Sequence, residues 1–93
     1  MSRATDAFVK ALNSLPVGSF TGTAHGRRYI ASKTTYSADK SVKLVAEELG
    51  GRDYISLNLY RLSDGARLYP CEMPLQKVVA FIRAFVTDQE GAA

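Results

Sequence analysis

Apolar positions recur at helical spacing near both ends of the chain. Over residues 4–15, apolar side chains return every three or four positions and form one stripe along a helix. Residues 72–88 carry a second stripe, with Pro74 at the first helical position and Glu72 near the positive end of the helix dipole. The pattern therefore predicts two amphipathic helices, one in each terminal part of the chain.

A two-residue period replaces the helical one in DYISLNLYRL, residues 53–62. Its apolar side would carry Ile55, Leu57 and Leu59. Its other side would carry polar and aromatic side chains: Tyr54, Ser56, Asn58 and Tyr60. The turn SDG and the segment ARLY follow, so this stretch predicts a β-hairpin with one apolar face.

An earlier segment, SFTGTAHGRRYIASKTTY, predicts another hairpin. It is rich in Thr, Ser, Tyr and Ile, which favour strands, and the letters HGRR break it in the middle. Phe20, Gly22 and Ala24 would share one face of its first strand. The pattern leaves open which side of the second strand faces inward, because its two alternating sets are about equally apolar.

Residues 41–49, SVKLVAEEL, fit two structures. In a helix, Ser41 would be the N-cap and Gly50 would follow the last turn. In a strand, Val42 and Leu44 would share one face, and LGGRD would turn the chain into the next strand. The period does not separate the two for so short an apolar run, and we favour the strand.

These elements predict an α+β fold of one domain. A chain of 93 residues supports a single core, with frayed ends at about 1–3 and 89–93. We expect an antiparallel sheet of four or five strands with both helices on one face, because both helical stripes need the apolar side of the sheet as cover. The polar and aromatic side of residues 53–62 would then lie on the other, open face.

Charge and cysteine content narrow the classes of protein. The net charge is +3, and residues 18–45 hold five cations against the single anion Asp39. Such a basic excess is typical of proteins that bind polyanions, although small basic domains are common. One cysteine, Cys71, and one histidine, His25, exclude an internal disulfide and a Cys/His zinc site, and nothing indicates a cofactor. No apolar run approaches the length of a membrane span, so we expect a cytoplasmic protein.

Aromatic side chains on an open sheet face suggest a site for single-stranded nucleic acid, whose bases stack on such rings while cations contact the phosphates. The predicted binding residues are Tyr54, Asn58, Tyr60, Arg27, Arg28, Lys33 and Lys43. Strands followed by a C-terminal helix resemble, in outline, the Whirly and transcriptional-coactivator class of single-strand binders, without a shared motif. We expect a non-enzymatic module that forms a homodimer.

Two other interpretations stay open. The open face could pair with its copy in a homodimer that has no affinity for nucleic acid. Alternatively, Cys71 could serve a thiol-dependent redox enzyme, because it lies just before a predicted helix N-terminus, where a thiol pKa is lowered. That role needs a base, and the sequence does not place His25 beside the thiol.

Overall fold

The computed structural model describes residues 2–38 and 40–88, which form two helices and seven strands. The helices are α1 (Asp6–Asn13) and α2 (Leu75–Ala84). The strands are β1 (Ser2–Arg3), β2 (Gly18–Ala24), β3 (Arg27–Tyr36), β4 (Ser41–Glu48), β5 (Tyr54–Leu62), β6 (Gly65–Pro70) and β7 (Val86–Thr87). Every strand pairing is antiparallel.

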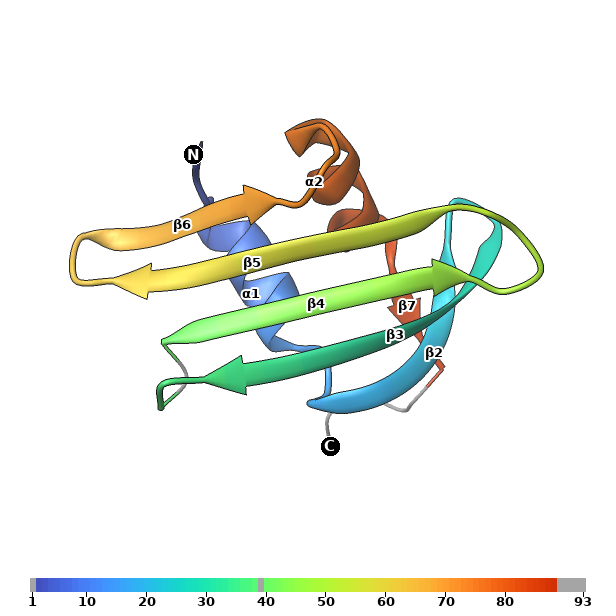
Figure 1. Cartoon of the computed structure of the whole chain (residues 1–93), viewed down its shortest axis with the longest axis horizontal. Coiled ribbons are helices and arrows are strands. Elements are labelled where there is room, and N and C mark those ends of the chain that lie inside the picture. Colours follow the sequence, from blue (N-terminus) through green and yellow to red (C-terminus); the bar gives the residue numbers. More distant parts are fainter. Residues whose placement is uncertain (1, 39, 89–93) are drawn as a thin grey trace.

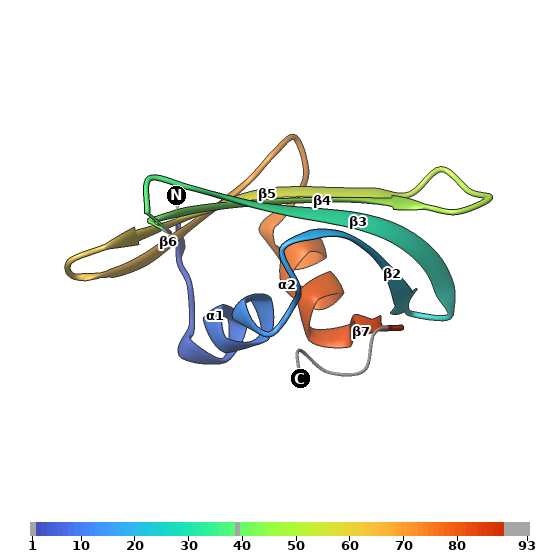
Figure 2. The same ribbon diagram turned by 90° about the horizontal axis from the view of Figure 1, so that it is seen from below.

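The strands form one sheet in the order β1-β6-β5-β4-β3-β2-β7 (Figure 1). Both helices lie on the same side of this sheet (Figure 2). Strands β2 and β3 curl towards the helices, and β2 thereby pairs with β7, the strand that follows α2. The predicted α+β class and the antiparallel sheet are confirmed, and the predicted placement of the helices is matched roughly. The strand number is larger than predicted, because β1 and β7 each hold two residues and are too short to show an alternating pattern.

The inward-facing side chains settle both questions that the sequence left open. Residues 41–48 form a strand, in which Val42, Leu44 and Ala46 are fully buried. In β3 the inward set begins with Tyr29 and Ala31, which face the same core. The core lies between the sheet and the two helices, and it also takes in Leu57 of β5.

Helix α1 is shorter than predicted at its N-terminal end. Ala4 donates its backbone N–H to Ala66 of β6, which continues the β1 pairing, and Thr5 then caps the helix by accepting a hydrogen bond from the Phe8 N–H. Residues 2 and 3, expected to fray, instead pair with β6. Residues 1 and 89–93 lie outside the described part of the chain.

Helix α2 ends earlier than predicted, because Phe85 takes an extended conformation and the chain continues as β7. The Phe85 ring lies 5.8 Å from Phe20 and 5.2 Å from Phe81, centroid to centroid. Gly22 permits this approach, since a side chain there would overlap the Phe85 ring and the Val86 carbonyl. Glu72 does not belong to the first helical turn, because it lies two residues before the N-cap Pro74.

Candidate functional site

The open face, defined as the side of β3–β6 opposite the helices, presents its side chains in cross-strand rows. One row runs from Tyr36 through Ser41 and Tyr60 to Arg67. The adjoining row consists of Thr34, Lys43, Asn58 and Tyr69. The predicted residues Asn58, Tyr60 and Lys43 thus lie on three neighbouring positions, as expected from their parity.

Three tyrosines gather at one end of this face. Tyr60 and Tyr69 meet edge to face with ring centroids 5.2 Å apart, and Tyr36 stands two strands away in the row of Tyr60. Their exposed fractions are 39%, 36% and 52%, so a large part of each ring is open to a ligand. We call Tyr36, Tyr60, Tyr69, Lys43 and Asn58 the tyrosine end. Tyr36 and Tyr69 were missed because the sequence did not fix the parity of β3 or the register of β6.

Tyr54 lies at the other end of β5. Tyr54 and Tyr60 are six positions apart, or about 20 Å along a strand. Its ring is 42% exposed, and the ammonium of Lys77 on α2 lies 5.5 Å from the ring centroid, a cation–π contact. Tyr54 therefore does not form one cluster with Tyr60, although both occupy the open face.

The predicted cations separate into different places. Lys43 is exposed on the open face opposite Asn58. Arg28 binds the Asp88 carboxylate through two hydrogen bonds of 2.8 and 2.7 Å, and this pairing lowers the pKa of Asp88 to about 2. Arg27 lies at the end of β3 near the helix side, 3.8 Å from Asp53. The four cations do not form one basic surface.

Lys33 is on the opposite side of the sheet from the predicted site. Its side chain is 5% exposed, and its ammonium donates to the carbonyl oxygens of Leu12 at 3.0 Å and Leu15 at 2.8 Å. It also lies 3.5 Å from the Asn13 carbonyl oxygen. These carbonyls belong to the C-terminal end of α1, where a cation is favourable. Lys33 thus secures α1 to the sheet and is too buried to contact a polyanion.

Cys71 and His25 are held on different sides of the molecule. The Asn58 amide donates to the Cys71 sulfur at 3.3 Å, and the Cys71 N–H donates to the Ser56 carbonyl, which places the thiol beside the open face. His25 occupies the turn between β2 and β3 and lines a pocket on the helix side. The structure therefore does not bring the thiol and the imidazole together.

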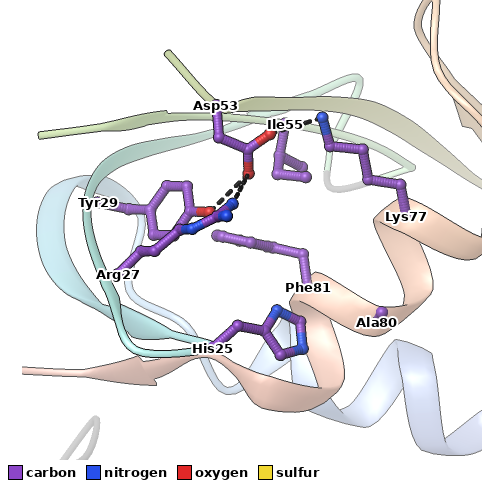
Figure 3. A pocket seen from close by; sticks show the side chains of 8 residues that line it. All are labelled: His25, Arg27, Tyr29, Asp53, Ile55, Lys77, Ala80 and Phe81. Atoms are coloured by element: carbon purple, nitrogen blue, oxygen red, sulfur yellow. Dashed lines mark hydrogen bonds and ion pairs between the residues drawn. The ribbon is translucent and has the colours of Figure 1, made fainter. Parts of the chain in front are cut away.

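A pocket that the sequence did not indicate lies where the β2–β3 turn faces α2. We call it the Asp53 pocket; it has a volume of about 190 Å³. Its lining consists of His25, Arg27, Tyr29, Asp53, Ile55, Lys77, Ala80 and Phe81 (Figure 3). The side chains of Arg27, Tyr29 and Lys77 converge on the Asp53 carboxylate from β3 and α2.

Hydrogen bonds and ion pairs fix this carboxylate. Lys77 Nζ lies 2.7 Å from Oδ1, and the Tyr29 hydroxyl donates to Oδ2 at 2.6 Å. Burial alone would raise the pKa of Asp53, but these two donors lower the pKa below its ordinary value. Burial, followed by the bond to Asp53, raises the pKa of Tyr29. Asp53 stays ionised and Tyr29 protonated at neutral pH, so neither group is tuned as a general acid or base.

No sequence signal could have assembled this pocket. Asp53 and Tyr29 are 24 residues apart in the sequence, and Lys77 lies on a separate element, helix α2. The three meet only because β3 and β5 both flank β4 and because α2 packs against β5. A lone aspartate before a strand does not predict such a meeting.

Neither described helix has the length and apolarity needed to cross a bilayer. Among residues 2–38 and 40–88, no group of three or more His, Cys, Asp or Glu side chains is arranged to hold a metal ion. The chain matches no protein-family model, no curated protein sequence and no solved structure. The outline resemblance to single-strand binders therefore gains no support from relatives, and the site has to be argued from its own geometry.

Proposed function

We propose that this chain is a non-enzymatic binding module that holds single-stranded nucleic acid on its tyrosine end. The observation that carries the proposal is the cluster of Tyr36, Tyr60 and Tyr69 beside Lys43 and Asn58 on a face turned away from the helices. Each ring offers a stacking surface to any base, and the lysine supplies a positive charge for the phosphates.

The spacing of the rings suits neighbouring bases. Tyr36 and Tyr60 stand two strands apart, or about 10 Å between backbones, so that two unstacked bases have room between them. The amide of Asn58 lies in the adjoining row, within reach of a base edge. Its Nδ2 already donates to the Cys71 sulfur, which leaves the carbonyl oxygen to accept from a base amino group.

Charge favours the tyrosine end over the rest of the open face. Lys43 lies there, whereas the opposite end carries Glu47 next to Tyr54, and the Lys77 ammonium near Tyr54 is paired with Asp53. The local field thus attracts a polyanion to the half of the face that has the ring cluster. Salt-dependent, sequence-tolerant affinity is the expected behaviour.

An anisotropy titration of a fluorescein-labelled single-stranded oligonucleotide at low and moderate salt tests the proposal. We expect saturable binding that weakens steeply with salt, and weaker binding by a duplex of the same sequence, whose bases are already stacked. The absence of binding at low salt would reject nucleic acid as the ligand.

A homodimer is the second candidate, and the other end of the open face favours it. Ile30 is 42% exposed there, next to a shallow hollow that it lines with Val45 and Ser32. An exposed branched side chain beside such a hollow is suited to pairing with its own copy. Sedimentation over a wide concentration range tests this candidate: a concentration-dependent mass that Ile30→Glu abolishes supports it, and a constant monomer mass rejects it.

A further inference from the structure

The Asp53 pocket continues into a second hollow along α2. This outer hollow has a volume of about 320 Å³ and is lined by His25, Ala80, Arg83 and Ala84. The two share His25 and Ala80, so they form one cleft between the β2–β3 turn and one face of α2. It lies on the helix side of the sheet, away from the tyrosine end.

Cations exceed carboxylates around this cleft. Arg27, Lys77 and Arg83 line it together with one carboxylate, that of Asp53. Glu48 is the other acid nearby: it accepts the Asp53 N–H at 3.2 Å, and its charge contributes to the raised pKa of Arg27, after the larger effect of the Tyr29 hydroxyl. Even with Glu48 included, the cleft keeps an excess of positive charge.

The N–H donors near the outer part of the cleft can still donate hydrogen bonds to a ligand. Lys77 and Tyr29 are committed to Asp53, whereas Arg27 stands 3.8 Å from that carboxylate, beyond a direct hydrogen bond. The side chains of His25 and Arg83 make no hydrogen bond or ion pair within the part of the chain that the structure describes. Arg27 lines the inner pocket, Arg83 lines the outer hollow and His25 lines both, while Lys77 and Tyr29 stay bound to Asp53.

The turn that carries His25 is a defined one. His25 and Gly26 both have positive φ, 51° and 75°, as the two central residues of a tight hairpin turn require. This conformation fixes the imidazole at the mouth of the pocket, facing α2 (Figure 3). The floor is apolar and aromatic: Phe81 packs edge to face on Tyr29, with ring centroids 4.9 Å apart, and Ile55 lies beside them.

From these observations we propose that the cleft binds a small organic anion, a carboxylate or phosphate group attached to a compact apolar body. The oxyanion lies at His25, where the two hollows join, with Arg27 on the inner side and Arg83 on the outer side, and an arginine fork can take two of its oxygens. The apolar body packs on Ala80, which is exposed and lines both hollows above the buried Phe81 ring. Asp53 acts as a positioning residue, because it holds Lys77 and Tyr29 against the inner wall and keeps a second negative charge from entering there. This proposal is independent of the tyrosine end.

A ¹H–¹⁵N NMR titration with phenyl phosphate, benzoate, inorganic phosphate and the neutral benzyl alcohol tests it. We expect saturable shifts from phenyl phosphate or benzoate, confined to residues 25–29 and 77–84, and weaker binding of inorganic phosphate and benzyl alcohol, each of which lacks one half of the ligand. Which of the two organic anions binds more tightly identifies the headgroup.

Three variants make the test specific. Arg83→Gln and His25→Asn are expected to weaken binding about tenfold or more, since glutamine lacks the charged guanidinium fork and asparagine lacks the imidazole ring. Asparagine also tolerates the positive φ of that turn. Lys10→Gln is the matched control, because it removes an exposed cation of α1 that lines neither hollow, and it is expected to leave anion binding unchanged. The backbone spectrum of each variant reports whether its fold is retained. Unsaturable shifts with both organic anions, or an equal loss in all three variants, would overturn the proposal.

Discussion

Tyr60 and Tyr69, on neighbouring strands of the open face, meet edge to face with ring centroids 5.2 Å apart. This geometry places the positive edge of one ring against the negative face of the other, which is the arrangement that aromatic pairs prefer. Each tyrosine thereby limits the rotamers of the other. A pair of rings that is ordered before the ligand arrives loses little further side-chain entropy on binding.

The ring pair should contribute measurably to stability. Replacing Tyr60 by Leu removes the edge-to-face contact while keeping an apolar side chain, and we expect the free energy of unfolding to fall by about 0.5 to 1.5 kcal/mol. Tyr36→Leu is the control, since Tyr36 is more exposed and lacks a ring partner among the described residues. Urea unfolding compares the two variants, and equal losses would show that the pair has no special contribution.

Salt dependence tests the role of Lys43. If its ammonium contacts a phosphate, Lys43→Gln should reduce the slope of log affinity against log salt by about 0.7, the value for one contact with a single strand. Lys10→Gln removes an exposed cation from α1, on the opposite side of the sheet, and should leave the slope unchanged. Identical slopes for wild type and Lys43→Gln would remove this lysine from the site.

Lys33 should prove structural. Lys33→Met removes the charged donor of the Leu12 and Leu15 carbonyl oxygens, of which the Leu12 oxygen keeps its bond from the Leu15 N–H, and we expect a loss of about 1.5 to 3 kcal/mol in the free energy of unfolding. Lys10→Met, an exposed change on α1, should keep the free energy of unfolding within about 0.5 kcal/mol of the wild-type value. Oligonucleotide affinity, measured where Lys33→Met remains folded, should equal that of wild type; a selective loss of affinity would return Lys33 to the binding site.

Acid should destabilise the fold through Asp53 and Asp88. Both carboxyls have folded pKa values below the unfolded value of about 3.9, and that of Asp88 is about 2. Their ionised forms therefore stabilise the fold above the unfolded pKa, and this contribution disappears as the pH falls from about 4 towards 2.

The expected decline can be assigned with single variants. Unfolding free energies measured between pH 6 and pH 2 should fall less steeply for Asp53→Asn and for Asp88→Asn than for wild type. Asp6→Asn, an exposed change in the first turn of α1, is the control. A wild-type slope in both test variants would contradict the pairings with Lys77 and Arg28.

The two-residue period of apolar side chains predicted most of the sheet correctly. Ile55, Leu57 and Leu59 are 1%, 0% and 0% exposed, because a strict period of two leaves one buried face and no competing arrangement. The predicted C-terminal end of α2 was wrong, because an apolar pattern also fits residues beyond the helix. Phe85 and Val86 continue the apolar stripe of the helix, and only the pairing of β7 with β2 turns them into an extended segment.

The candidate sites show where pattern reasoning stops. A lysine is commonly exposed, so a strand pattern cannot reveal that the end of α1 lies above Lys33 and offers it carbonyl oxygens. The parity of Asn58 and Tyr60 could be read from their own strand, whereas Tyr69 joins them through the register of β6. The Asp53 pocket depends on tertiary contacts alone, so the sequence pattern could not predict it.

Oligonucleotide affinities of Tyr60→Phe, Tyr60→Ala and Tyr54→Ala, measured at one salt concentration, test the central claim most directly. Stacking needs the ring and not the hydroxyl, so Tyr60→Phe should bind as wild type does, and Tyr60→Ala should lose about 1 to 3 kcal/mol of binding free energy. Tyr54→Ala, at the far end of the same strand, should bind within about twofold of wild type, a change below 0.5 kcal/mol. Equal affinities for Tyr60→Ala and wild type would contradict the account.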